Sequence, residues 1–207
     1  MTVLDIHTHH PDDTQAIISV NPGEFRPAPG RLYSVGIHPW HSEQCDTHAI
    51  DALNAAARHP QVAALGETGL DTLRGAPIAR QTQLLLHHLE LAQATGKPIV
   101  VHCVRAWQPL IAACRKARVG QGRIAIHGFR GNANVARTLV DEGFYLSFGL
   151  HFNPSALTVT PLDRILIETD DEPVSIGLVA QHVAAALSMP TEQLIAHARA
   201  NAATFLT

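Results

Sequence analysis

The sequence predicts an α/β fold, a compact TIM-type (β/α)8 barrel whose first βα unit is eroded. Short apolar segments alternate with segments of helical periodicity, and the joints between them are short, which is typical of a parallel α/β sheet. Eight apolar segments are present, beginning near residues 3, 16, 32, 62, 98, 123, 144 and 164. An open doubly wound sheet is the alternative, but no GxGxxG follows any segment, which disfavours its nucleotide-binding form.

The N-terminal segment predicts a buried strand that ends in a polar sequence. Met1-Thr2-Val3-Leu4 runs into Asp5-Ile6-His7-Thr8-His9-His10. Because side chains two apart in a strand share one face, we expect His7 and His9 to point the same way, with Ile6 on the opposite face. Two imidazoles converging at a strand end can hold a divalent metal, although an isolated pair is better explained as a polar strand terminus.

The second strand is predicted at residues 16–20, after a turn at residues 10–13. The gap between the first two strands is shorter than the dozen residues that a parallel crossover usually needs. The second strand is therefore either antiparallel or follows an eroded βα unit. Residues 21–31 contain three prolines and two glycines and predict a loop.

From residue 32 onward, strands and helices alternate regularly. Strands are predicted at 32–38, 62–66, 98–103, 123–126, 144–148 and 164–170. Helices are predicted at 49–58, 78–94, 106–118, 134–142, 176–187 and 191–205. In the helical segments apolar residues recur three or four positions apart, as on the buried face of a helix.

Composition limits the classes of protein that the chain can belong to. Its 207 residues are 46% hydrophobic and carry a net charge of −3, which fits one globular domain, 1–207, without a basic field for nucleic acid. The apolar runs are too short for a membrane span, and the N-terminus lacks an export signal. Three cysteines without a CxxC pair fit a reducing compartment, so a cytoplasmic location is expected.

Histidines and carboxylates stand at the ends of six predicted strands. In a barrel all these ends open on one face, where active sites are built. Any one such residue is readily explained as structural, but their joint occurrence predicts a shared metal site. The residues are His7, His9, His38, Glu67, His102, His127 and Asp170.

Six motifs carry these residues in chain order. They are Asp5-Ile6-His7-Thr8-His9, Gly36-Ile37-His38-Pro39, Gly66-Glu67-Thr68-Gly69-Leu70-Asp71, Val101-His102, His127-Gly128-Phe129-Arg130-Gly131 and Glu168-Thr169-Asp170. The set resembles the TatD family of metal-dependent hydrolases, within the amidohydrolase-like barrels. The likeness extends over essentially the whole chain, and the combination of GExGLD, HxFxG and ETD is specific.

The resemblance implies a deoxyribonuclease that cleaves phosphodiester bonds at DNA ends as a 3′–5′ exonuclease. It implies two divalent metal ions that activate a water, and nitrogen and oxygen ligands fit Zn²⁺, Mn²⁺, Ni²⁺ or Mg²⁺. The implied ligands are His7, His9 and Asp170 on one ion, His102 and His127 on the other, and Glu67 between them. Asp170 and Glu67 are the implied catalytic residues.

Further residues are candidates for positioning and substrate binding. His38, Arg105 and Arg130 are candidates for contact with a substrate phosphate. Asp71 is expected to orient a ligand histidine, since metal-bound imidazoles usually donate their other nitrogen to an acceptor.

The chain departs from the family pattern in ways that concern the substrate. It is shorter than typical members, residues 171–175 form a short acidic loop, and Thr72 and Leu73 replace aromatic residues. These losses leave three readings open besides the exonuclease: an amidohydrolase, a small-molecule phosphoesterase using the same metals, or a metal-binding protein without catalysis. We expect a monomer without membrane attachment, with an oligomer as the alternative.

Overall fold

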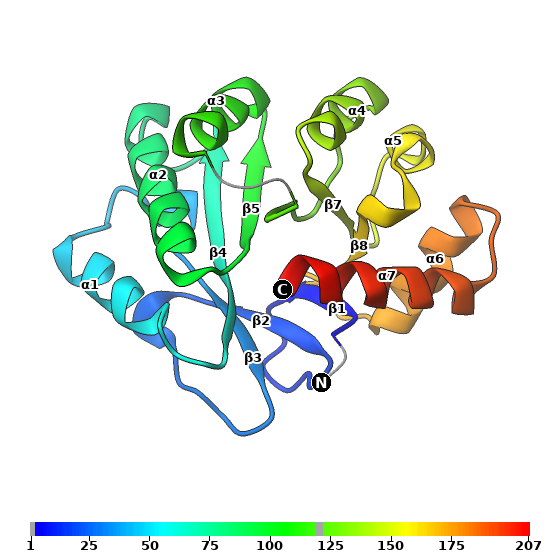
Figure 1. The fold of residues 1–207 in the computed structure, drawn as a ribbon, viewed down its shortest axis with the longest axis horizontal. Helices are drawn as coiled ribbons and strands as arrows, with labels where there is room; N and C mark the ends of the chain where they lie inside the picture. Colours follow the sequence, from blue (N-terminus) through cyan, green and yellow to red (C-terminus); the bar gives the residue numbers. More distant parts are fainter. Residues whose placement is uncertain (1–2, 119–121) are drawn as a thin grey trace.

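The computed structural model describes residues 3–118 and 122–207, which fold into a closed barrel of eight parallel strands (Figure 1). The strands follow one another around the barrel in chain order, and β8 pairs with β1. This confirms the (β/α)8 barrel over the open sheet. The strands are β1 Asp5–Thr8, β2 Ala16–Val20, β3 Leu32–Val35, β4 Val62–Asp71, β5 Ile99–Val104, β6 Ile124–Ile126, β7 Tyr145–Phe148 and β8 Ile165–Ile167.

The helices surround the barrel, with α2 and α3 outside β4 and β5 in Figure 1. They are α1 Thr47–Ala56, α2 Ile78–Thr95, α3 Trp107–Ala117, α4 Ala133–Asp141, α5 Pro154–Val159, α6 Ile176–Ala186 and α7 Thr191–Leu206. The short α5 was not predicted. Its signal is Asn153, whose side chain accepts from the Ser155 amide, followed by Pro154 at the first helical position. Within the described ranges, no helix is long and apolar enough to cross a bilayer.

The first two strands are joined without a helix. β1 and β2 pair in parallel, with Asp5 opposite Ala16, so the eroded βα unit is confirmed and an antiparallel second strand was wrong. Seven residues suffice for the return because β1 is only four residues long, and an extended chain rises about 3.3 Å per residue. The connection from β2 to β3 holds only the 3₁₀ turn η1, Pro22–Glu24. Met1 and Thr2 of the predicted first strand lie outside the described residues.

Side chains from seven strands fill the inside of the barrel. They form one buried apolar cluster with Ala202 and Phe205 of α7, which crosses the barrel beside β1 in Figure 1. Phe205 packs on Tyr145 of β7 with ring centroids 5.6 Å apart. Apolar side chains and α7 therefore fill the N-terminal end of the barrel, and polar groups gather at the other end.

Two register shifts turn site residues into the barrel. In β1 the pairing with β2 shifts between Asp5 and Thr8, so Ile6 joins the interior cluster although its neighbour His7 also faces the site. The expectation that Ile6 lies on the opposite face was wrong for this reason. In β4 the register with β5 shifts between Leu65 and Thr68, where Glu67 lies. Bulges of this kind redirect side chains beside active sites.

A buried histidine outside the site gives the fold a measurable dependence on pH. His88 of α2 accepts the Ile37 amide through Nε2 and bonds the Leu84 carbonyl through Nδ1, and burial lowers its pKa to about 4. The unfolded chain therefore binds more protons between pH 4 and 6.5, and stability falls as the pH drops through that window. We expect His88 to contribute about 2 kcal/mol to the loss of unfolding free energy between pH 7 and pH 5.

Chemical denaturation of the metal-free protein at the two pH values measures this contribution. His88→Gln, which keeps an acceptor and a donor but does not titrate, is expected to show the smaller loss. Equal losses in the two proteins would contradict the assignment.

Candidate metal centre

The structure brings six sequence-predicted residues together at the C-terminal end of the barrel. Five of them line one cavity of about 410 Å³, and the sixth, His7, is fully buried beside it. Among the residues that the structure describes, three overlapping groups of histidines and carboxylates, one of which includes His38, each place three donor atoms within 4.8 Å of one another. The six residues are His7 on β1, His9 just after it, Glu67 on β4, His102 on β5, His127 after β6 and Asp170 after β8.

Glu67 stands between two sets of imidazoles. Its Oε2 lies 3.4 Å from Nε2 of His7 and 3.8 Å from Nε2 of His9. Its Oε1 lies 2.7 Å from Nε2 of His127 and 2.9 Å from Nδ1 of His102. One carboxylate thus presents one oxygen to each set, which is the arrangement needed to bridge two cations.

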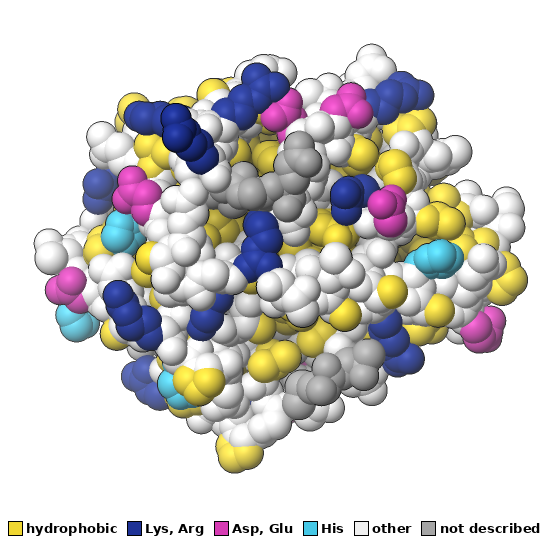
Figure 2. Space-filling model, in the orientation of Figure 1, with side chains coloured by type: hydrophobic (Ala, Val, Ile, Leu, Met, Phe, Trp, Pro, Cys, Tyr) yellow, Lys and Arg dark blue, Asp and Glu magenta, His cyan; other side chains and the backbone are white. Residues whose placement is uncertain are grey.

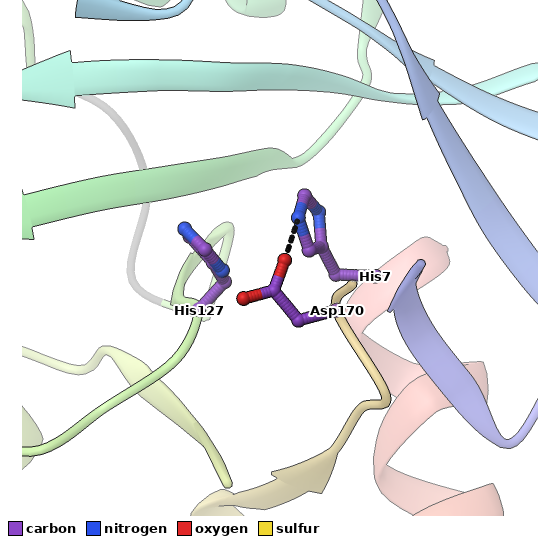
Figure 3. A group of neighbouring side chains, drawn as sticks. All are labelled: His7, His127 and Asp170. Carbon is purple, nitrogen blue, oxygen red and sulfur yellow. Dashed lines mark ion pairs between the residues drawn. The ribbon is translucent and has the colours of Figure 1, made fainter. Parts of the chain in front are cut away.

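Asp170 lies beside His7 and His9, the two imidazoles on the Oε2 side of Glu67. Its Oδ1 lies 3.5 Å from Nε2 of His7 and 3.6 Å from Nε2 of His9, and Figure 3 shows its carboxylate between His7 and His127. The backbone seats it there, because the Asp170 amide donates to the His7 carbonyl and its own carbonyl accepts the His9 amide. Pairing between β1 and β8 therefore continues past the end of β8 and fixes Asp170 beside the two histidines.

The three predicted substrate-binding residues occupy different places. His38 lines the cavity, with Nε2 2.9 Å from Oε1 of Glu67. Arg105 lines a separate groove between α3 and α4, and Arg130 is exposed. Among the described residues that line the cavity, none is arginine or lysine.

The electrostatics of the site favour ionised carboxylates. Burial opposes ionisation of Glu67, but the charge of His127 and hydrogen bonds from three imidazoles hold its pKa well below the usual range. Burial also opposes ionisation of Asp170, but contacts with His7 and His127 lower its pKa to about 2. Burial and the charge of His127 lower the pKa of His7, but the nearby carboxylates of Glu67 and Asp170 outweigh them and raise it to about 9. The buried carboxylates and imidazoles therefore stabilise one another's charges, and both carboxylates are ionised at neutral pH.

Two further carboxylates contact the ring nitrogens of His102 and His127 that do not face Glu67. Nδ1 of His127 lies 3.3 Å from Oε1 of the fully buried Glu168, which also accepts the Gly128 amide. Nε2 of His102 lies 3.3 Å from Oδ2 of Asp71, so the contact expected for Asp71 is present. The role of Glu168 was not predicted, although it stands with Asp170 in the Glu168-Thr169-Asp170 motif at the end of a strand.

Comparison with known proteins identifies the family. A family model described as TatD related DNase matches residues 26–207, a span that begins after His7 and His9. The Escherichia coli K12 protein named uncharacterized metal-dependent hydrolase YcfH is 30% identical over 184 residues, covering 79% of this chain and 69% of that protein. The Cronobacter turicensis protein named 3'-5' ssDNA/RNA exonuclease TatD is 30% identical over 147 residues, covering 66% of this chain and 56% of that protein.

Solved structures agree with the fold. The structure of YJJV, a TatD homologue from Escherichia coli K12, superposes with a TM-score of 0.85 at 20% identity, covering 99% of this chain and 97% of that chain. A TatD-family hydrolase from Entamoeba histolytica superposes with a TM-score of 0.78 at 14% identity, covering 99% and 98%. Identity this low shows the fold alone. The family model, which covers most of the chain, confirms the resemblance predicted from the motifs: the chain belongs to the TatD-related DNase family.

Proposed function

We propose that this protein is a metal-dependent phosphodiesterase that removes nucleotides from the 3′ ends of single-stranded nucleic acid. The observation that supports the chemistry most directly is the Glu67 carboxylate, which presents one oxygen to each of two imidazole sets. The direction and the substrate are supported by the relative from Cronobacter turicensis, which is named a 3'-5' ssDNA/RNA exonuclease.

The residues of the centre fit a pair of divalent cations. Among the described residues, neither buried ring nitrogen of His7 has a hydrogen-bond partner, although carboxylate oxygens lie within 3.5 Å of Nε2. A buried polar atom without a partner is costly, and a cation coordinated by Nε2 would satisfy that nitrogen. The donor set is imidazole nitrogen and carboxylate oxygen, which suits Zn²⁺, Mn²⁺ or Ni²⁺, and Mg²⁺ through the carboxylates.

We assign the ligands by the side of Glu67 on which they lie. His7, His9 and Asp170 would hold one ion, His102 and His127 the other, and Glu67 would contact both. Two bound ions would lower the pKa of an attacking water and neutralise negative charge on the phosphoryl oxygens.

The remaining steps depend on this chain's own side chains. Asp170 is ionised at neutral pH and partly exposed to the cavity, so its carboxylate can orient the attacking water and take up its proton. Nδ1 of His38 accepts the Trp40 amide, which leaves the proton of the neutral ring on Nε2, inside the cavity. Burial lowers the pKa of His38 and keeps the ring neutral. That proton faces Oε1 of Glu67, 2.9 Å from Nε2. With Glu67 engaged by cations, His38 would be free to donate a hydrogen bond to a phosphoryl oxygen.

Replacing Asp170 with asparagine is expected to lower the nuclease rate by at least about 100-fold, because both a metal ligand and the proton acceptor are lost. The assay follows stepwise shortening of a 3′-tailed single-stranded DNA oligonucleotide with added Mg²⁺, Mn²⁺, Ni²⁺ or Zn²⁺, and with a chelator as control. Asp171→Asn, the neighbouring carboxylate on the same cavity wall, is the matched control and is expected to change the rate less than about threefold. An active Asp170→Asn protein would contradict this assignment.

Replacing Glu168 with alanine is expected to weaken metal binding about 10- to 100-fold, because His127 loses the acceptor of its outer nitrogen. Glu168→Gln keeps an acceptor at that position and is expected to lose less. Competition with a chromogenic chelator measures the metal dissociation constants of the three proteins. Identical constants would show that Glu168 does not position His127.

A second candidate function is hydrolysis of a small phosphoester or an amide with the same metals. It is favoured by Glu24 and Asp171, which line the cavity where basic side chains are absent among the described lining residues. On the face shown in Figure 2, lysine and arginine side chains are scattered singly or in small groups. A polyanion is normally bound by clustered positive charge. Bound metal without oligonucleotide shortening, together with turnover of a small phosphoester or amide, would favour this candidate.

A further inference from the structure

One large aromatic side chain stands exposed beside the metal centre. Trp40 belongs to the 3₁₀ turn η2, Pro39–His41, which follows β3, and it lines the cavity with 41% of its surface exposed. Its ring centroid lies 4.7 Å from that of His38 and 5.7 Å from that of His102. The indole is therefore adjacent to His102, which is assigned to a metal, and to His38, which is assigned to a substrate phosphate, within reach of a group attached to that phosphate.

The indole is held in one orientation without being buried. Its Nε1–H donates to Oδ2 of the buried Asp71 at 2.6 Å, and Asp71 Oδ1 accepts the Leu73 amide at 2.7 Å. The guanidinium of Arg74 lies over the ring, 4.4 Å from its centroid. The same Asp71 oxygen contacts Nε2 of His102, so one carboxylate fixes both the exposed indole and a candidate metal ligand. A fixed aromatic ring loses little conformational freedom when another ring stacks on it.

We propose that Trp40, backed by Arg74, is a stacking platform for the nucleobase next to the bond that is cleaved. This rests on the proposed function and narrows it, since it names a base-bearing nucleic acid strand as the substrate in place of an amide or a base-free phosphoester. Every nucleobase has a π face, and aromatic stacking binds single strands without sequence preference. The chain has a net charge of −3, and the cavity lining offers no lysine or arginine among the described residues. Stacking would therefore supply binding free energy for the strand that charge attraction does not.

The protein has two tryptophans, so one substitution isolates the signal of Trp40. Trp107→Phe removes the other fluorophore, which lies on α3 beside the separate groove. The probe is a thymidine oligonucleotide with phosphorothioate linkages, added with Mg²⁺, which coordinates sulfur poorly, so that binding is observed while cleavage is suppressed. The matched probe has the same length and linkages but abasic sugars. We expect the thymidine probe to quench Trp40 emission and the abasic probe to leave it unchanged.

Two substitutions separate stacking from the hydrogen bond to Asp71. Trp40→Phe and Trp40→Leu both lose the indole N–H, but only phenylalanine keeps an aromatic face. Affinity for the thymidine probe, measured by anisotropy of a labelled strand, is expected to fall roughly 10-fold or more in Trp40→Leu and substantially less in Trp40→Phe. Affinity for the abasic probe is expected to be the same in both variants.

The outcomes distinguish the two proposals. If the thymidine probe binds but Trp40 emission does not respond, or if the two Trp40 variants bind it equally, stacking is overturned and the proposed function stands. If neither probe binds while the metals do, the proposed nuclease function fails and the stacking proposal fails with it.

Discussion

Replacing Glu67 with glutamine is expected to lower nuclease activity by well over 100-fold and to reduce the metal content of the purified protein. Mutating a residue that only orients a metal ligand typically lowers metal affinity or activity about 10- to 100-fold. Glu67 is assigned to contact both ions directly, so a larger loss is expected. Glutamine has nearly the same volume but cannot offer a charged oxygen to each imidazole set. The carboxylate oxygens 2.7 Å from His127 and 3.4 Å from His7 are the contacts that change.

Metal content by mass spectrometry and the exonuclease rate are the two readouts for Glu67→Gln. Glu24→Gln is the matched control, since Glu24 lines the same cavity from η1 but lies outside the ligand set. We expect Glu24→Gln to retain wild-type metal content and activity within about threefold. Wild-type metal content in Glu67→Gln would show that Glu67 is not a bridging ligand.

Replacing Gly69 with alanine is expected to prevent folding or to destabilise the protein by more than about 4 kcal/mol. Gly69 lies in β4 opposite His102 of β5 and has a φ of +146°, a conformation that side chains rarely adopt. A Cβ built there would stand 1.9 Å from the backbone oxygen of His102. Relief of that clash requires the two strands to separate at a candidate metal ligand.

Gly96→Ala is the matched control for Gly69→Ala. Gly96 ends α2 with a φ of +68°, but a Cβ there meets no atom of the described residues within 4 Å. The cost of this substitution is expected to be about 1–2 kcal/mol, which is the strain of a left-handed residue alone. Thermal unfolding and soluble yield measure both variants. Similar stabilities for the two proteins would show that close approach of β4 and β5 is not required.

The alternation of strands and helices could be predicted because it depends on local periodicity. The direction of β2 could not, since it follows from closure of the barrel by β1 pairing with β8. The end of β4 was also missed. The sequence predicts a strand ending at Gly66, but residues 68–71 continue to pair with β5, so Glu67 lies within the strand and a register shift turns it inward.

The candidate ligands could be predicted because strand ends converge in a barrel whatever the details of packing. Directions of side chains beyond the strands could not be predicted in this way. Arg105 comes three residues after His102, yet it lines the groove beside α3 and α4. His38 was expected to meet a substrate phosphate, and the structure places its Nε2 against Glu67. The role of Trp40 depends on its contacts with Asp71 and Arg74, which no spacing in the sequence indicates.

The measurement that tests the central claim most directly is an anomalous scattering map from crystals of this protein soaked in Mn²⁺. We expect one peak among His7, His9 and Asp170, a second between His102 and His127, and Glu67 in contact with both. Peaks confined to other parts of the molecule, or a centre without metal at saturating Mn²⁺, would contradict the two-metal assignment.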